Sequence, residues 1–153
     1  QKGNPKGFTS IADVCGHTMA GQTGANASRI AHEEASRCQK EGKPKLTVQD
    51  YPDQSGVITA IKSGRADAAA LDYTGAVGFV RQDGGKTLEV AFEQQENKAP
   101  YGIGFRKDDE SLMQSFQEAL KELISDGTYA ELLKKWDISA ASLTTAAING
   151  AVS

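Results

Sequence analysis

The stretch SGRADAAALDYTGA, Ser63 to Ala76, holds a short run of mainly small apolar residues that ends in an acid, Asp72. The run at residues 66–72 is too short for a typical helix. Without polar alternation, it is typical of a strand that is covered on both faces. Gly64 ends one helix pattern before the run, and Tyr73 begins another directly after it. A buried strand between two helices is the unit from which parallel α/β sheets are built.

Helix and strand patterns alternate on both sides of this run. Upstream, the sequence predicts a helical turn, two strands and two helices at residues 10–16, 17–22, 45–51, 28–42 and 53–64. Downstream, it predicts a helix at 73–85 and a strand at 88–92. The order β-α-β-α-β-α-β predicts an α/β fold, a mostly parallel open sheet with helices on both faces.

The pattern changes at Tyr101. We expect one more strand at 101–107, two amphipathic helices at 108–127 and 128–137, and an extended tail. The apolar residues of the two helices lie at helical spacing. They are Leu112, Phe116, Leu120, Leu123 and Ile124 in the first helix and Tyr129, Leu132, Leu133 and Trp136 in the second.

Composition limits the kind of protein. The 153 residues are 39% hydrophobic and 24% charged, and no apolar run approaches the ~20 residues of a membrane span. The 17 basic residues are scattered and the net charge is −3, which argues against nucleic acid as a partner. Because the chain begins with Gln1 and not Met, we expect that an upstream segment has been removed.

Catalytic and cofactor motifs are missing from the sequence. It contains no phosphate-binding P-loop, no G-x-S-x-G elbow and no HExxH helix, so we expect no cofactor and no catalytic residues. The histidines, His17 and His32, are expected to be solvated. The two cysteines, Cys15 and Cys38, leave three alternatives: a disulfide, two buried thiols, or a metal site that matches no usual zinc spacing.

Two stretches fall where ligands bind in open parallel sheets, at the carboxyl ends of strands. Residues 22–28, QTGANAS, form a glycine turn before a helix, whose free N–H groups favour an anion. Asp72 ends a strand, where it serves either as a helix cap or as a counter-charge for an ammonium group. Together they predict a site for a zwitterion, of which an α-amino acid is the simplest.

These features together resemble the second lobe of polar amino-acid solute-binding proteins of ABC importers, which have the type II periplasmic-binding-protein fold. The resemblance is carried by GNPKGFTSIADVCGHTMAGQTGANAS, SGRADAAALDYTGA and YGIGFRKDDESLMQSFQEALKELISDGTYAELLKKWDIS, and it covers nearly the whole chain. It implies residues 1–100 as the ligand-binding lobe, 101–137 as a hinge strand and C-terminal helices, and 138–153 as a tail.

The resemblance also implies roles for single residues. The loop after the first strand would hold the ligand's α-carboxylate through Thr23, Gly24, Ala25 and Asn26, although the family often has a second Thr or Ser where Ala25 and Asn26 stand. Gln22 would touch the ligand's side chain, and Asp72 would bind its ammonium group. Cys15 and Cys38 resemble a disulfide of actinobacterial members, which implies a location outside the cytoplasmic membrane.

Partners and alternatives follow from the same resemblance. It implies an amino-acid ligand and a membrane permease, in a protein that is not an enzyme and is extracellular, lipid-anchored at the cell surface, or periplasmic. The C-terminal helices would pack on a first lobe that precedes these residues in the family, so without it we expect self-association and weak ligand binding. The alternatives are a dehydratase on the same fold, similar to cyclohexadienyl dehydratases, and the sensing domain of a membrane receptor.

Overall fold

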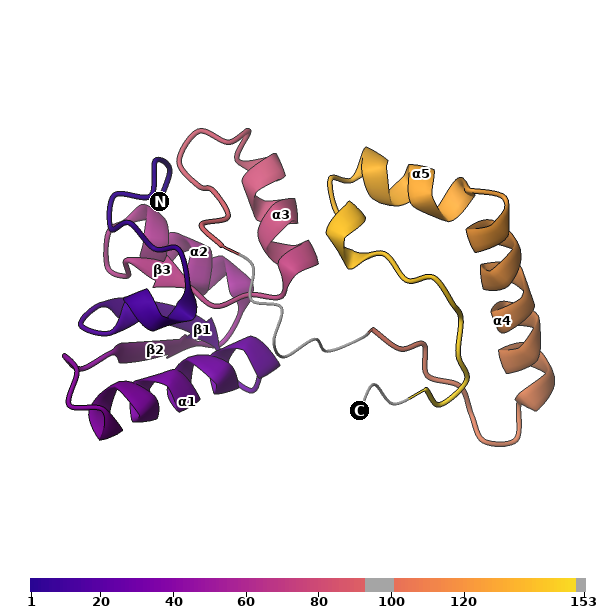
Figure 1. Ribbon diagram of the computed structural model, residues 1–153, viewed down its shortest axis with the longest axis horizontal. Coiled ribbons are helices and arrows are strands. Elements are labelled where there is room, and N and C mark those ends of the chain that lie inside the picture. Colours follow the sequence, from indigo (N-terminus) through magenta and orange to yellow (C-terminus); the bar gives the residue numbers. More distant parts are fainter. Residues whose placement is uncertain (93–100, 151–153) are drawn as a thin grey trace. The chain divides into compact units, whose positions relative to one another are not determined.

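The computed structural model describes residues 1–92 and 101–150. It divides into two compact units, Gln1–Gln94 and Gln95–Ser153, which are treated separately below. Figure 1 labels the helices and strands of both units. In order they are η1 (Ile11–Val14), β1 (Thr18–Gln22), α1 (Asn26–Lys40), β2 (Thr47–Tyr51), α2 (Gln54–Lys62), β3 (Ala68–Ala69), α3 (Tyr73–Gln82), α4 (Glu110–Ser125), α5 (Thr128–Lys135) and η2 (Ser139–Ala141).

The first unit is built on a parallel sheet of three strands in the order β2-β1-β3 (Figure 1). Met19 and Ala20 of β1 pair with Ala68 and Ala69 of β3, and further backbone hydrogen bonds extend this pairing to residue 70. The predicted α/β class and parallel sheet are therefore confirmed. The strand expected over 66–72 is shorter than predicted, since β3 covers only Ala68–Ala69 and residues 70–72 lead from it into α3.

Side chains of the sheet alternate between two cores. Met19 packs in one buried cluster with Ala31 and Cys38 of α1, whereas Ala20 packs in a second cluster with Val57 and Ala60 of α2. Because successive strand residues point to opposite faces, α1 and α2 cover opposite faces of the sheet. The neighbouring strand β3 follows the same alternation, as expected for a strand that is covered on both faces.

The strand predicted at residues 88–92 is wrong, since the structure has no strand there. The Asp83 carboxylate accepts the backbone N–H groups of Thr87, at 2.6 Å, and Leu88, at 3.2 Å, so these groups are not available to a sheet. Asp83 also pairs with Lys62 of α2 at 2.6 Å. The Lys62 ammonium and the Thr87 N–H hold the pKa of Asp83 well below its ordinary value, so this link between α2 and the end of α3 is charged at neutral pH.

The second unit contains α4 and α5 as predicted, but no strand at 101–107. Tyr101 and Ile103 are 68% and 64% exposed, and an extended segment without a paired neighbour does not form a stable strand. The tail contains the short turn η2 and returns to the helices through a hydrogen bond from the Gln117 amide to the Ala146 carbonyl. Several large apolar side chains of the helices are exposed, namely Leu112, Phe116, Leu123, Leu132 and Trp136.

Candidate functional site

The candidate site lies at the carboxyl edge of the sheet, where β1 and β3 end side by side. β1 ends at Gln22, and β3 leads through Leu71 into Asp72. The parallel pairing of β1 with β3 places both strand ends at the same edge. Neighbouring strands lie about 4.8 Å apart, which is the scale of the charged end of one amino acid.

Asp72 occupies the N-cap position of α3 with extended backbone angles, φ −61° and ψ 143°. Its side chain makes no capping hydrogen bond, although many Asp residues at this position do. The residue is exposed. Capping therefore does not occupy this carboxylate, and its negative charge is available to a cation at the sheet edge.

The loop after β1 is fixed by hydrogen bonds to β2 and to itself. The Thr23 N–H and hydroxyl both donate to the Tyr51 carbonyl, at 2.9 and 3.2 Å, and the Ala25 N–H donates to the Gln22 carbonyl at 3.0 Å. Gly24 takes φ 77°, a left-handed conformation that glycine adopts without strain. Two of the N–H groups expected to hold a ligand are thus used within the protein.

α1 begins two residues before the helix predicted at 28–42. Ala25 is the N-cap and has no side chain with which to cap, while Asn26 is the first helical residue. The N–H groups in the first turn of an α-helix have no partner within the helix. Together with Gly24, the N–H of Asn26 and those of the next residues form the donor set that this loop offers to an anion, strengthened by the helix dipole.

A polar network that the sequence analysis missed fixes α1 to the sheet. Asp50 of β2 lies beside Gly21 of β1, and its carboxylate accepts the hydroxyl of Ser28 and contacts the His32 ring nitrogen at 2.7 Å. The hydrogen bond from Ser28 and the His32 ring hold the pKa of Asp50 below its usual range. The sequence predicts a solvated His32, but the structure places its ring against Asp50, where it anchors the second turn of α1.

His17 also has structural contacts. Its ring meets Phe8 edge-on at 5.0 Å and lies 3.6 Å from the Asp67 carboxylate. Asp67 in turn accepts the backbone N–H of Thr18 at 3.0 Å, at the beginning of β1. His17 thus lies at the opposite edge of the sheet from Asp72, as the sequence indicates.

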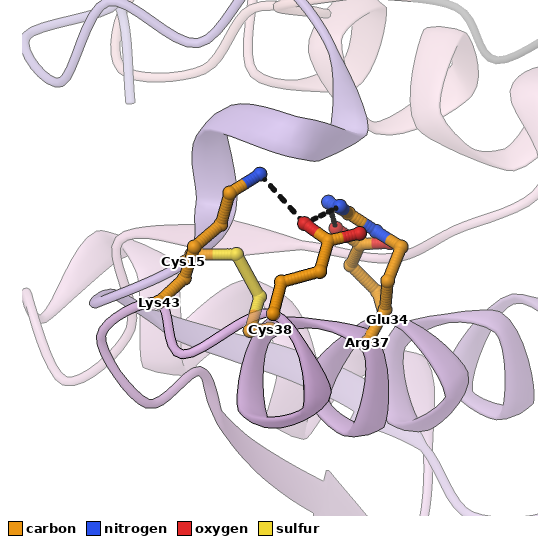
Figure 2. The surroundings of a disulfide bond; sticks show 6 residues. Cys15, Glu34, Arg37, Cys38 and Lys43 are labelled. Atoms are coloured by element: carbon orange, nitrogen blue, oxygen red, sulfur yellow. Dashed lines mark hydrogen bonds and ion pairs between the residues drawn. A yellow bond between two sulfur atoms is a disulfide. The ribbon is translucent and has the colours of Figure 1, made fainter.

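Cys15 and Cys38 form a disulfide, with their Cα atoms 5.7 Å apart (Figure 2). It joins the segment before β1 to the last turns of α1. Glu34 lies beside it, 7% exposed, in an ion pair with Arg37. Donor atoms of Cys15, Glu34 and Cys38 lie within 4.8 Å of one another, but sulfurs bonded to each other are not the thiolates that zinc binds. The arrangement is that of a structural crosslink.

The disulfide is expected to contribute about 3 kcal/mol to the free energy of unfolding, since it closes a loop with a sequence separation of 23. Replacing both Cys15 and Cys38 with serine should lower the urea-unfolding free energy by that amount. The oxidised chain should weigh about 2 Da less than the reduced chain, as the bond removes two hydrogens. Two free thiols in the untreated protein would contradict the assignment.

Comparison with known proteins identifies the family. The sequence profile of bacterial extracellular solute-binding proteins, family 3, matches residues 30–139. The chain belongs to this family. The expected resemblance is thus confirmed, together with the location outside the cytoplasm that the family's description gives. Among the described helices, none is both long enough and apolar enough to cross a bilayer.

Two family members illustrate the relationship. The lysine/arginine/ornithine-binding periplasmic protein of Escherichia coli is 38% identical over 96 residues, which are 60% of this chain and 37% of that protein. The L-cystine-binding protein TcyA of Bacillus subtilis is 28% identical over 127 residues, 83% of this chain and 43% of that protein. The chain therefore spans about two fifths of the length of these relatives.

Solved structures share the fold. An ancestral arginine-binding protein bound to arginine superposes with a TM-score of 0.67 at 27% identity, over 88% of this chain and 57% of that one. An ancestral amino acid-binding protein that is a precursor of cyclohexadienyl dehydratase gives 0.64 at 25% identity, over 89% and 53%. These neighbours confirm that the chain has the type II periplasmic-binding-protein fold.

Proposed function

We propose that the chain is the ligand-binding part of an extracellular substrate-binding protein of an amino-acid ABC importer, and that it binds a polar α-amino acid. The carboxylate binds the N–H groups at Gly24 and the start of α1, and the ammonium group binds Asp72. The observation that carries the proposal is the parallel pairing of β1 and β3. It places the loop after β1 beside Asp72, whose carboxylate makes no capping hydrogen bond. The names of the relatives, which bind basic amino acids or cystine, support this ligand class.

Other loop residues complete the proposed site. Gln22 follows Ala20 on the face of the sheet that α2 covers, and it contacts the ligand's side chain. The Thr23 hydroxyl, which donates to the Tyr51 carbonyl, keeps its lone pairs for the ligand ammonium or a bridging water. Ala25 shapes the turn but donates nothing to the ligand, because its N–H is bonded to the Gln22 carbonyl. The proposed partners are the amino acid and the membrane permease of the importer.

We propose binding in preference to catalysis. One structural neighbour is a precursor of cyclohexadienyl dehydratase, and such an enzyme needs an acid or base beside its substrate. Residues 22–28 and 72–74 include one carboxylate, Asp72, and neither histidine nor lysine. A single carboxylate that pairs with an ammonium group is not free to transfer protons, which favours a binding protein.

A thermal-shift screen of the full-length gene product against the twenty amino acids tests the proposal. A ligand at one hundred times its Kd stabilises the folded state by about 2.7 kcal/mol, so a true ligand raises Tm by several degrees. We expect one or a few polar amino acids to do so. Turnover of chorismate-derived acids, with no response to amino acids, would support the dehydratase instead.

Self-association is proposed for the 153-residue chain by itself. The exposed apolar side chains of α4, α5 and the residue after α5, including Phe116 and Trp136, are of the kind that oligomer interfaces bury. Size-exclusion chromatography should show a species larger than a monomer. A monomeric elution at micromolar concentration would contradict this part of the proposal.

A further inference from the structure

The side chain of Asn26 and the guanidinium of Arg29 form a pair at the start of α1. Arg29 donates to the Asn26 side-chain oxygen Oδ1 through Nε, at 3.2 Å, and through a terminal nitrogen, at 2.7 Å. Its other terminal nitrogen contacts Glu33. Asn26, Arg29 and Glu33 are spaced three and four residues apart, so they share one face of the helix.

These contacts fix which end of the Asn26 amide is free. A guanidinium is a donor only, so the atom that it contacts must be the amide oxygen. The amide nitrogen, which carries two donors, is then the end left for a ligand. Within residues 1–92 and 101–150, that nitrogen makes no hydrogen bond.

The orientation matters at a site for a carboxylate. An unrestrained asparagine can present either its oxygen, which repels an anion, or its NH₂ group, which binds one. Holding the oxygen in advance removes the unfavourable orientation and reduces the cost of ordering the side chain when ligand binds. The charge on Arg29 adds to the positive end of the helix dipole.

We propose that Arg29 is a positioning residue that aims the Asn26 amide nitrogen at the carboxylate of the ligand. The inference rests on the proposed function. It deepens that function by assigning the recognition of the carboxylate to a side-chain pair as well as to the backbone. Glu33 holds the guanidinium from the other side and keeps it beside Asn26.

A double-mutant cycle in the full-length gene product tests the inference, with L-arginine, L-lysine and L-cystine as probes in isothermal titration calorimetry. Arg29→Lys keeps the charge but loses the paired donors, and we expect it to weaken binding about three- to tenfold. Asn26→Thr replaces the amide with a hydroxyl that needs no such orientation. In the Asn26→Thr background, Arg29→Lys should therefore change the Kd less than twofold.

The outcomes separate the inference from the proposed function. If Arg29→Lys weakens binding equally with asparagine and with threonine at position 26, Arg29 acts on the ligand directly. If Arg29→Lys leaves binding unchanged in both backgrounds, Arg29 has no role in binding. Either result overturns the inference and leaves the proposed function standing. Binding of none of the three probes by the unchanged protein overturns both. Asn26→Asp, which places an oxygen at the free end, should weaken binding tenfold or more if the inference holds.

Discussion

Replacing Asp72 with alanine is expected to remove most of the thermal stabilisation that an amino-acid ligand gives to the full-length protein. Truncating one partner of a hydrogen-bonded charge pair costs about 2 to 5 kcal/mol, which corresponds to a Kd raised about 30-fold or more. Asp72→Asn keeps the size and removes the charge, so it should lose nearly as much. Calorimetric titration of each variant with the ligand found in the amino-acid screen measures the effect.

The folded state itself should change little, since the Asp72 side chain makes no capping hydrogen bond. Asp109 provides a matched control, because it is the N-cap of α4 and its side chain likewise makes no capping hydrogen bond. Asp109→Ala should bind the ligand as the unchanged protein does. Equal binding by the Asp72 and Asp109 variants would remove Asp72 from the site, and with it the basis for an ammonium-bearing ligand.

Much of the fold follows from local patterns. The helix predicted at 53–64 is confirmed as α2, and Asp53 caps it by accepting the Gly56 N–H at 2.8 Å. The strand predicted at 88–92 fails for a reason that local patterns do not contain. Asp83 precedes it in sequence, and whether its carboxylate takes the N–H groups of Thr87 and Leu88 depends on how α3 ends. One side chain thus takes a backbone donor, the Leu88 N–H, that the predicted strand would have used in a sheet.

The candidate site was predicted in outline from strand ends and a glycine turn. The structure adds which donors are already used: the Thr23 N–H by the Tyr51 carbonyl of β2, and the Ala25 N–H by the Gln22 carbonyl within the turn. It also adds the Ser28–Asp50 link, whose partners lie 22 positions apart. The sequence predicts that β1 and β2 pair in parallel, which places the end of β2 beside the end of β1. That pairing was the signal from which a link between α1 and β2 could have been predicted.

Gly21 makes the close approach of α1 to the sheet possible. A Cβ atom at this position would lie 2.5 Å from the Ser28 hydroxyl oxygen and 2.8 Å from its Cβ. Ser28 is 3% exposed, and its Cβ is carried directly by the helix backbone, so it cannot swing away. Relief of the clash requires a shift of the first turns of α1, which would also disturb the hydrogen bond to Asp50.

Gly21→Ala is therefore expected to lower the free energy of unfolding by about 2 to 4 kcal/mol, the sum of overpacking and a weakened hydrogen bond to a charged group. Urea unfolding of the purified chain measures it.

Gly78 of α3 is the control, because a Cβ there meets nothing within 4 Å, and Gly78→Ala should stabilise the chain by about 0.5 to 1 kcal/mol. Adding Ser28→Gly to Gly21→Ala removes both clashing atoms and should recover part of the loss, despite the glycine introduced into α1. A Gly21→Ala variant as stable as Gly78→Ala would show that the helix start, and the turn proposed to bind the carboxylate, is not held by this contact.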